Sequence, residues 1–201
     1  AINKTLPSPP NSLPRVADLF DKVRGFVVAS SLDLENGYDQ MRIHTPDQIK
    51  TAFTWRRVRY MFVGTPFGLK HVTQHFQRAM EEILDDCHLF VVVYVDDVLV
   101  FSNDLEQHIE HLRLVISLLS EHNLRLRLSK CNFGCTQLLM LGHVLRGDSR
   151  LPDPAKISAL YDYDVPETGR QVMAYLGFIN YLRDYIPFYS TIAAPLERLR
   201  K

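Results

Sequence analysis

The sequence has few cysteines, no excess of either charge and no long apolar run, and each absence narrows what the protein can be. Its three cysteines among 201 residues are an odd number without a disulfide-scaffold pattern, which suits a reducing compartment. No apolar stretch approaches the roughly 18 residues of a membrane span, and the polar, proline-rich start does not read as a signal peptide. We therefore expect an intracellular protein without a membrane partner.

The charge balance gives a second constraint. The 23 basic residues equal the 23 acidic ones, which counts weakly against a nucleic-acid binder, since such proteins usually carry a basic face. Local basic clusters occur at residues 56–59 and 125–130; each is either a contact surface or an ordinary solvated strand face. Cys131, Cys135 and His143 match no familiar zinc module, so we expect no zinc site there.

The most informative segment is Tyr94-Val95-Asp96-Asp97, which interrupts the most apolar part of the chain. Alternating aromatic and β-branched residues on both sides of the acidic pair predict a hairpin. Adjacent carboxylates at the tip of a buried hairpin repel each other, and a divalent cation would neutralise them. Asp33 ends another apolar run, so two strand ends could deliver three aspartates to a two-metal phosphoryl-transfer site. An acidic pair can also be a plain turn, which is how we interpret Asp85-Asp86.

The rest of the chain alternates strand-like and helix-like segments. Helical patterns cover residues 16–23, 72–84 and a stretch capped by Asn103 or Asp104, whose predicted buried stripe is Ile109, Leu112, Val115, Ile116 and Leu119. Strand patterns cover residues 26–34, a hairpin with arms at 50–53 and 60–63, and residues 124–128 and 138–145, followed by a charged link at 146–150. Asp153-Pro154 starts a helix, and Thr168 with Gln171 forms a capping box for another that Pro187 ends. Residues 1–14 are predicted to be an extended arm. This order indicates an α+β fold, an antiparallel sheet with helices on one face and a small helical subdomain.

Motifs along almost the whole length resemble the reverse transcriptases of long-terminal-repeat retrotransposons of the Ty3/Gypsy type. Their order and separations make the resemblance specific. The motifs are Leu13-Pro14-Arg15-Val16, Leu32-Asp33-Leu34 with Gly37-Tyr38, Lys50-Thr51-Ala52-Phe53, Pro66-Phe67-Gly68-Leu69, Phe76-Gln77-Arg78, Val93-Tyr94-Val95-Asp96-Asp97 with Phe101-Ser102, His111-Leu112, Lys130-Cys131 with Phe133, Leu141-Gly142-His143-Val144, and Tyr175-Leu176-Gly177 with Tyr181 and Ile186-Pro187.

The resemblance implies a right-hand polymerase with an RNA-directed DNA polymerase activity that uses deoxynucleoside triphosphates. Residues 1–25 would be an arm and short helix at the edge of the fingers and palm. Residues 26–145 would be the palm with partial fingers, the fingers insertion lying at about residues 44–70. Residues 146–201 would begin the helical thumb or connection.

The resemblance also implies roles for particular residues. Asp33, Asp96 and Asp97 match the catalytic carboxylates that bind two Mg²⁺ ions, with Mn²⁺ as an alternative, and Asp33 and Asp96 are expected to be the direct ligands. Tyr38 matches the aromatic residue that excludes a ribose 2′-hydroxyl, with plain core packing as the alternative. Lys130 matches a proton donor to pyrophosphate, although a salt bridge or a solvated charge is an equal alternative. The other implied nucleotide contacts are Leu34, Gly37, Phe67 and Gly68. The implied template-primer contacts are Tyr94, Leu141, Gly142 and His143, the last of which could equally be a structural histidine.

Some features depart from the family pattern. The fingers strands with a triphosphate-binding arginine and lysine would precede Ala1, and an RNase H domain would follow Lys201. Ala29-Ser30-Ser31 and Met61 replace an aromatic-Ser-Lys triplet and a glutamate. We expect a piece of a polyprotein that also holds RNase H and integrase regions and acts in a cytoplasmic virus-like particle or the nucleus. We also expect weak binding of an RNA or DNA template with its primer, because phosphate contacts dominate such affinity.

Two alternatives come from other functional classes. A decayed or domesticated module could bind nucleic acid or protein without catalysis, although such a module needs no buried acidic cluster. A nuclease or phosphotransferase could use the same carboxylates, although Tyr38 and the segment at residues 141–143 argue for a polymerase.

Overall fold

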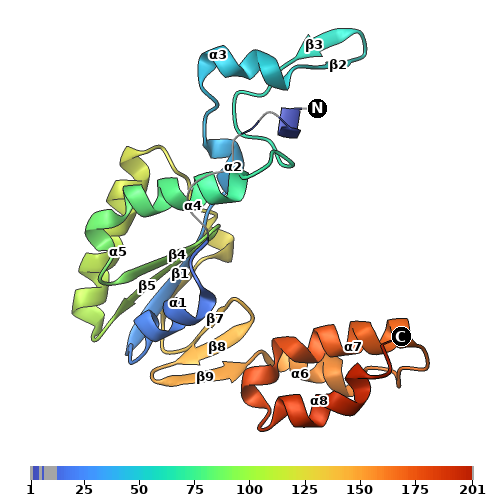
Figure 1. The fold of residues 1–201 in the computed structure, drawn as a ribbon. Coiled ribbons are helices and arrows are strands. Elements are labelled where there is room, and N and C mark those ends of the chain that lie inside the picture. The colour runs from blue at the N-terminus through green and yellow to red at the C-terminus, as the bar shows by residue number, and fades with distance from the viewer. Residues whose placement is uncertain (1, 5, 7–12, 201) are drawn as a thin grey trace. The chain divides into compact units, whose positions relative to one another are not determined.

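The computed structural model of the chain describes residues 2–4, 6 and 13–200 (Figure 1). The chain divides into two compact units. The first unit holds residues 1–138 and 146–148, and the second holds residues 139–145 and 149–201. Most of the predicted arm at residues 1–14 lies outside the described residues, and the described part includes a 3-10 turn, η1 (Ile2–Lys4). Within the described residues, no helix has both the length and the apolar character needed to cross a membrane.

The first unit is built on an antiparallel sheet. Its strands run in the order β4-β5-β1-β6, with each neighbouring pair antiparallel. The predicted strand at residues 26–34 and the predicted acidic hairpin are both present, whereas β6 was not predicted. The strands are β1 (Val28–Asp33), β4 (Val91–Tyr94), β5 (Asp97–Ser102) and β6 (Asn132–Cys135).

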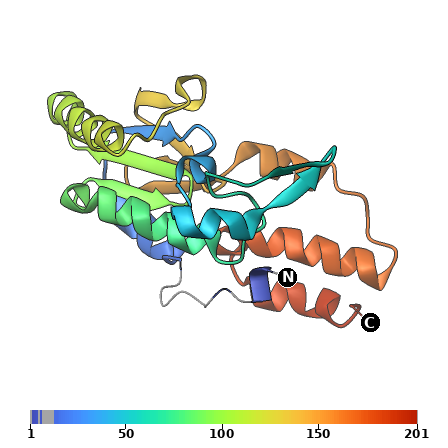
Figure 2. The same ribbon diagram turned by 90° about the horizontal axis from the view of Figure 1, so that it is seen from above.

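Three helices pack beside these strands (Figures 1 and 2), and two of them form the main core with the sheet. Both α4 and α5 contribute buried apolar side chains that meet Leu32, Val98 and Val100 of the sheet. Asp104 caps α5 by accepting a hydrogen bond from the Gln107 amide, as predicted. The helices are α1 (Val16–Val23), α4 (Val72–Ile83) and α5 (Leu105–Glu121), and the 3-10 turn η3 (Asp85–Cys87) follows α4 where a plain acidic turn was expected.

Helix α5 presents a different face to the sheet from the one that its apolar pattern predicts. Val115 and Leu119 are buried as expected, but Ile109 and Ile116 are exposed. The core position two turns before Val115 is taken by His108, which is only 1% exposed. The prediction for the two isoleucines was therefore wrong, because a polar side chain fills the place that hydrophobic periodicity assigns to an apolar one.

A hydrogen-bond chain explains why a histidine is tolerated there. His108 Nε2 lies 2.7 Å from Ser30 Oγ on β1, and His108 Nδ1 lies 2.9 Å from Ser102 Oγ on β5. Ser102 Oγ also bonds to His111 Nδ1, and Ser30 Oγ accepts the Gly134 amide of β6. Ser30, the middle residue of the Ala29-Ser30-Ser31 triplet and the one that keeps the serine of the family pattern, thus joins three strands and a helix.

The fingers-like insertion contains a hairpin whose arms differ from those predicted. The strands lie closer to the turn than residues 50–53 and 60–63, and residues 49–51 form a 3-10 turn. Thr51 Oγ1 accepts the Phe62 amide at the base of the hairpin. The elements are α2 (Gly37–Gln40), α3 (Thr45–Gln48), η2 (Ile49–Thr51), β2 (Phe53–Trp55) and β3 (Val58–Tyr60).

Two other strand predictions need correction. Residues 124–128 form only a single bridge, Leu34 with Leu126, before a 3-10 turn. Residues 138–145 turn back at residues 141–142, and the supposed link at 146–150 is the turn of a further hairpin, giving a three-stranded sheet β7-β8-β9. The elements are η4 (Leu128–Lys130), β7 (Leu138–Met140), β8 (His143–Arg146) and β9 (Ser149–Pro152).

The second unit is mainly helical, and its capping signals are confirmed. Asp153 caps the first helix through the Ala155 amide, and Thr168 and Gln171 form the predicted capping box. The third helix was not predicted, and the second ends at Tyr181 rather than near Pro187, because a 3-10 turn intervenes. The elements are α6 (Pro154–Tyr161), α7 (Gly169–Tyr181), η5 (Arg183–Tyr185) and α8 (Tyr189–Glu197).

Candidate functional site

Strand register places two of the three predicted aspartates side by side. Asp33, at the end of β1, pairs directly with Asp97, at the start of β5. Their neighbours Leu32 and Val98 also pair and enter the core beneath α4 and α5. Since successive side chains alternate between the faces of a strand, Asp33 and Asp97 project from the opposite face. Tyr94 also pairs with Asp97 and shares that face.

The turn between β4 and β5 consists of Val95 and Asp96, because Tyr94 and Asp97 are the last paired residues. Val95 has a φ of 54°, a conformation that costs a β-branched residue of order 1–3 kcal/mol. Gln77 of α4 holds this turn: its Oε1 accepts the Val95 amide at 2.6 Å, and its Nε2 donates to the Val93 carbonyl at 2.9 Å. The helix therefore fixes the strained backbone that presents Asp96.

Asp96 lies against the start of α2. A Cβ atom at Gly37 would stand 2.9 Å from Asp96 Oδ1 and 2.9 Å from Phe76 Cζ, so only glycine allows this approach without a shift. Asp96 Oδ1 is buried and finds no hydrogen-bond partner among the residues that the structure describes. A buried carboxylate oxygen in this position is costly unless a cation or a donor meets it.

The electrostatics of the cluster follow from burial and proximity. Burial raises the pKa of Asp96, and the Asp33 carboxylate raises it further. Although Asp97 is exposed as a whole residue, partial burial of its carboxyl raises its pKa, with further contributions from Asp96 and Asp33. Both shifts have the same cause: burial and the neighbouring carboxylates oppose a negative charge on Asp96 and on Asp97. Carboxylate oxygens suit Mg²⁺ or Mn²⁺, yet within the described residues no group of three or more His, Cys, Asp or Glu side chains stands at metal-holding distances.

Tyr38 and Phe67 lie together beside α4. The Tyr38 ring is buried and makes edge-to-face contacts with Phe67 and Phe76, at centroid distances of 5.3 and 5.2 Å. Its hydroxyl lies 3.2 Å from Thr73 Oγ1. Phe67 itself is 74% exposed, so part of its ring remains open to solvent beside the buried Tyr38.

Asn3 braces the loop that carries Phe67 and Gly68. Its side-chain amide donates to the Gly68 carbonyl at 2.8 Å and accepts the Lys70 amide at 2.8 Å. Sequence reasoning missed Asn3, and it named Gln77 only as part of a motif. An asparagine or glutamine whose partners are backbone groups far along the chain leaves no local pattern to detect.

The segment that carries Lys130 runs along the end of β1. The Arg127 amide donates to the Asp33 carbonyl at 2.8 Å, and the Asp33 amide donates to Cys131 Sγ at 3.4 Å. Lys130, between these two contacts, is exposed. Leu34 is buried in the core, so its side chain supports the strand end and does not face solvent.

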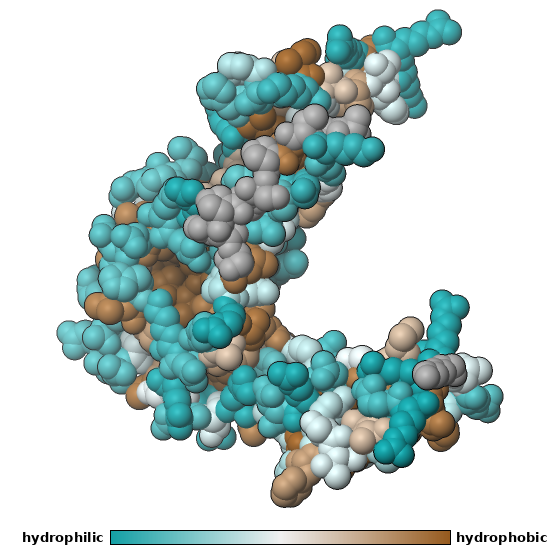
Figure 3. Space-filling view, in the orientation of Figure 1, coloured by the Kyte–Doolittle hydropathy of each residue, from teal (hydrophilic) through white to brown (hydrophobic). Residues whose placement is uncertain are grey.

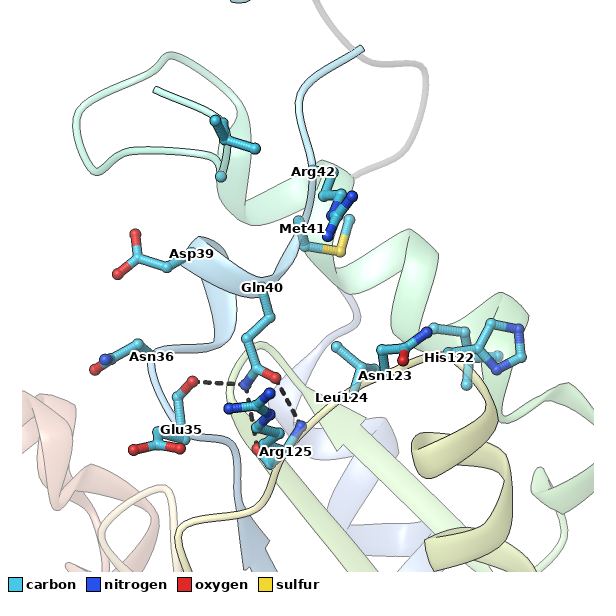
Figure 4. A pocket seen from close by; sticks show the side chains of 13 residues that line it. Glu35, Asn36, Asp39, Gln40, Met41, Arg42, His122, Asn123, Leu124 and Arg125 are labelled. Atoms are coloured by element: carbon cyan, nitrogen blue, oxygen red, sulfur yellow. Dashed lines mark hydrogen bonds between the residues drawn. The ribbon is translucent and has the colours of Figure 1, made fainter. Parts of the chain in front are cut away.

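A pocket of about 1060 Å³ lies beside the β1–α2 connection (Figure 4). Gln40 bridges one side of it: its Nε2 donates to the Glu35 and Arg125 carbonyls, and its Oε1 accepts the Arg125 amide at 2.6 Å. The bridge ties the segment after Asp33 to the segment that leads to Lys130.

The other predicted contacts belong to the second unit. Leu141 and Gly142 form the β7–β8 turn, with φ values of 48° and 72°. Tyr181 donates a hydrogen bond to the Leu141 carbonyl and lies where a Cβ on Gly142 would clash with its hydroxyl. His143 is buried, lies 2.6 Å from the Tyr185 hydroxyl and stacks on Tyr181. Burial lowers the pKa of His143, and Arg150 lowers it further, while Asp184 opposes them.

Comparisons with known proteins identify the family and the fold of this chain. The sequence profile of the family described as "Reverse transcriptase (RNA-dependent DNA polymerase)" matches residues 3–179. The chain belongs to the reverse transcriptase family. Its relatives include the Pol polyproteins of the Drosophila melanogaster transposons opus, 37% identical over 86% of this chain, and gypsy, 32% identical over 98%. These relatives place it with the Ty3/Gypsy type.

The chain spans only 17% and 19% of the length of those two polyproteins. Among solved structures, a foamy viral protease-reverse transcriptase in complex with double-stranded DNA matches with a TM-score of 0.92 at 24% identity, covering 99% of this chain and 35% of that one. The same viral protein in complex with an RNA/DNA hybrid matches with a TM-score of 0.89 over 100% of this chain and 27% of that one. The antiparallel sheet with its helices is thus a polymerase palm fold.

Proposed function

We propose that this reverse transcriptase domain catalyses template-directed transfer of deoxynucleotides to a primer, with Asp33, Asp96 and Asp97 as its catalytic carboxylates. The observation that carries the proposal is the direct pairing of Asp33 with Asp97 beside the turn that carries Asp96. Divalent ions held by these carboxylates would supply a lower pKa for the primer 3′-hydroxyl and neutralise charge on the triphosphate. The buried, unpartnered Asp96 Oδ1 suits such an ion.

The surrounding side chains are assigned roles that fit their positions. Tyr38, held between Phe67 and Phe76, excludes a 2′-hydroxyl, since its ring cannot yield. Phe67 and Gly68 pack against the incoming nucleotide and its template base. Lys130, exposed beside the end of β1, protonates the departing pyrophosphate.

The partners follow from the same proposal. The domain binds an RNA or DNA template with its primer, and Tyr94 and the turn at Leu141-Gly142 contact the primer backbone. The buried His143, bonded to Tyr185, supports that turn. The relatives' description as Pol polyproteins supports neighbouring RNase H and integrase regions and action within a particle of the element or in the nucleus.

The experiment is primer extension by the chain on matched RNA and DNA templates, with deoxynucleotides and Mg²⁺ or Mn²⁺. Asp33→Asn should abolish extension, whereas Asp21→Asn, an exposed change on α1, should leave it unchanged. Full extension by Asp33→Asn would contradict the proposal. Cleavage of the labelled strand that depends on Asp33, without extension, would replace it with a nuclease.

A further inference from the structure

A second pocket, of about 660 Å³, lies in the first unit between the fingers-like insertion and the start of α4. A cavity of this volume is large enough to hold a small molecule. Its described lining is separate from the residues to which the proposed function assigns a role, although Phe76 both lines it and contacts the Tyr38 ring. Figure 3 shows apolar side chains between hydrophilic ones over this insertion.

The interior of this pocket is apolar, and its hydroxyl donors are already used. Thr65 Oγ1 donates to the Met41 carbonyl at 2.8 Å. Thr51 Oγ1 donates to the Gln48 carbonyl at 2.6 Å. A polar ligand body would therefore lose its hydrogen bonds to water without replacement, whereas an apolar body would gain from burial. The apolar lining residues are Leu6, Met41, Ile43, Leu69, Val72 and Phe76.

Two cations at this pocket lack an acidic partner. Arg42 and Lys70 line it and are exposed, and within the described part of the chain neither side chain forms an ion pair. The Asp47 carboxylate also lines the pocket, but it is engaged by Lys50 at 2.5 Å. An unpaired guanidinium and an unpaired ammonium beside an apolar cavity favour a ligand with one anionic group, and a carboxylate suits both.

Hydrogen bonds fix the walls of the pocket in the absence of a ligand. The chain at residues 41–43 is joined to residues 63–65 by a β-bridge with two backbone hydrogen bonds of 2.9 Å. Asn3 holds residues 68–70 through two further hydrogen bonds of 2.8 Å. A ligand that enters a preformed cavity loses little free energy to ordering the protein, so even a small molecule can bind.

We propose that this pocket binds a small carboxylate with an apolar body, such as a medium-chain alkyl carboxylate. The apolar body lies among Ile43, Leu69 and Phe76. The carboxylate meets Arg42 and Lys70, the cation pair of the pocket. A nucleotide fits less well, because its base and sugar would need donors that the two threonine hydroxyls have already given to the backbone. An apolar peptide would bury backbone amides with the same lack of partners.

Octanoate is the probe, and octanol is its uncharged counterpart. Each is titrated calorimetrically into the full chain in EDTA, without nucleotides or nucleic acid, so the result does not depend on whether the chain polymerises. Octanoate should bind at one site and about tenfold or more tightly than octanol, since hydrogen bonds to charged groups are the stronger ones. It should also raise the unfolding temperature as its concentration rises, because it binds only the folded chain.

Two variants separate charge from cavity. Arg42→Gln with Lys70→Gln removes the cation pair from exposed positions and should weaken octanoate by about tenfold or more while leaving octanol unchanged. Ile43→Trp fills the cavity and should abolish binding of both compounds. The control is Arg78→Gln with Arg113→Gln, which removes the same charge from two exposed helix positions and should bind octanoate as the parent chain does.

Equal octanoate affinities for the cation-pair variant and the control would overturn the proposal, and this comparison decides the matter even if Ile43→Trp fails to fold. Absence of octanoate binding, together with dTTP binding in EDTA that the cation-pair variant loses, would also overturn it, because the pocket would then be a phosphate site.

Discussion

The β4–β5 and β2–β3 hairpins of the first unit both reverse the chain over two residues, and both place non-glycine residues at positive φ. In the β4–β5 turn this residue is Val95, and in the β2–β3 turn both residues are arginines. The first turn is anchored by Gln77 from a packed helix. In the second, the arginine side chains extend into solvent. Strain that a packed helix holds in place can position a carboxylate, whereas strain at an exposed tip leaves the charged side chains in solvent.

The largest expected effect is at the carboxylate of the anchored turn. Asp96→Asn should weaken Mn²⁺ binding by more than about a hundredfold, the upper end for residues that act only in an outer shell. Without metal it should raise the unfolding temperature, because burial and Asp33 oppose the charged form of Asp96. Calorimetry with Mn²⁺ and thermal unfolding in EDTA measure the two effects. Asp86→Asn, in the exposed turn after α4, is the matched control, and equal behaviour of both variants would contradict the assignment.

The next effect concerns the anchor itself. Gln77→Leu leaves the Val95 amide and the Val93 carbonyl without their side-chain partner. The expected cost is about 2–6 kcal/mol in the free energy of unfolding, since each of the two unsatisfied groups costs about 1–3 kcal/mol. Gln74→Leu, a partly exposed change on the same helix, should shift it by less than about 0.5 kcal/mol. Urea unfolding measures both. Similar stabilities for the two variants would mean that Gln77 does not hold the turn.

A smaller effect contrasts the two turns directly. Arg56→Asn with Arg57→Gly should stabilise the β2–β3 hairpin by about 1 kcal/mol, the low end for relief of one strained residue, because glycine relieves position 57 while asparagine still adopts a positive φ at position 56. This corresponds to about fivefold slower amide exchange in β2 and β3. Val95→Asn should give no such gain, because Val95 packs against the core and loses apolar contact as the strain is relieved. A clear gain at Val95 would show that the anchored turn is not optimised for packing.

The sequence alone predicts those features of the fold and the site that depend on patterns within a few neighbouring residues. The apolar runs that end at Asp33 and flank Asp96 predict a strand and a hairpin, and the strand register then places Asp33 opposite Asp97. The capping residues Asp104 and Thr168 mark helix starts because their partners lie only three residues away.

Features that depend on distant partners are not predictable in this way. Gln77 reaches a strand 16 to 18 residues away, and His108 meets Ser30 across 78 residues. Because the serine partners of His108 are far away in the sequence, apolar periodicity alone assigns Ile109, and not His108, to the core. The arms of the β2–β3 hairpin were misplaced because residues 58–63 are mostly apolar or aromatic yet exposed, so burial does not fix where the strands end.

The smallest expected effect is a dependence of stability on pH that originates on the covered face of the same sheet. Burial lowers the pKa of His108, and His111 lowers it further. As the pH falls below about 6.5, the ordinary value for histidine, the unfolded chain takes up the proton before the folded one does, so stability decreases. Asp96 and Asp97, whose pKa values are raised, act in the opposite sense at lower pH, where the folded state takes up protons first and their repulsion is relieved.

Urea midpoints of the first unit should therefore fall from pH 7.5 to 5.5. His108→Gln should flatten this slope even if it lowers stability throughout, whereas His122→Gln, at the exposed end of α5, should retain it. An unchanged slope in His108→Gln would mean that the acid sensitivity does not come from His108 and its bonds to Ser30 and Ser102. The aspartates of the β4–β5 turn could not explain it either, since their protonation stabilises the folded state.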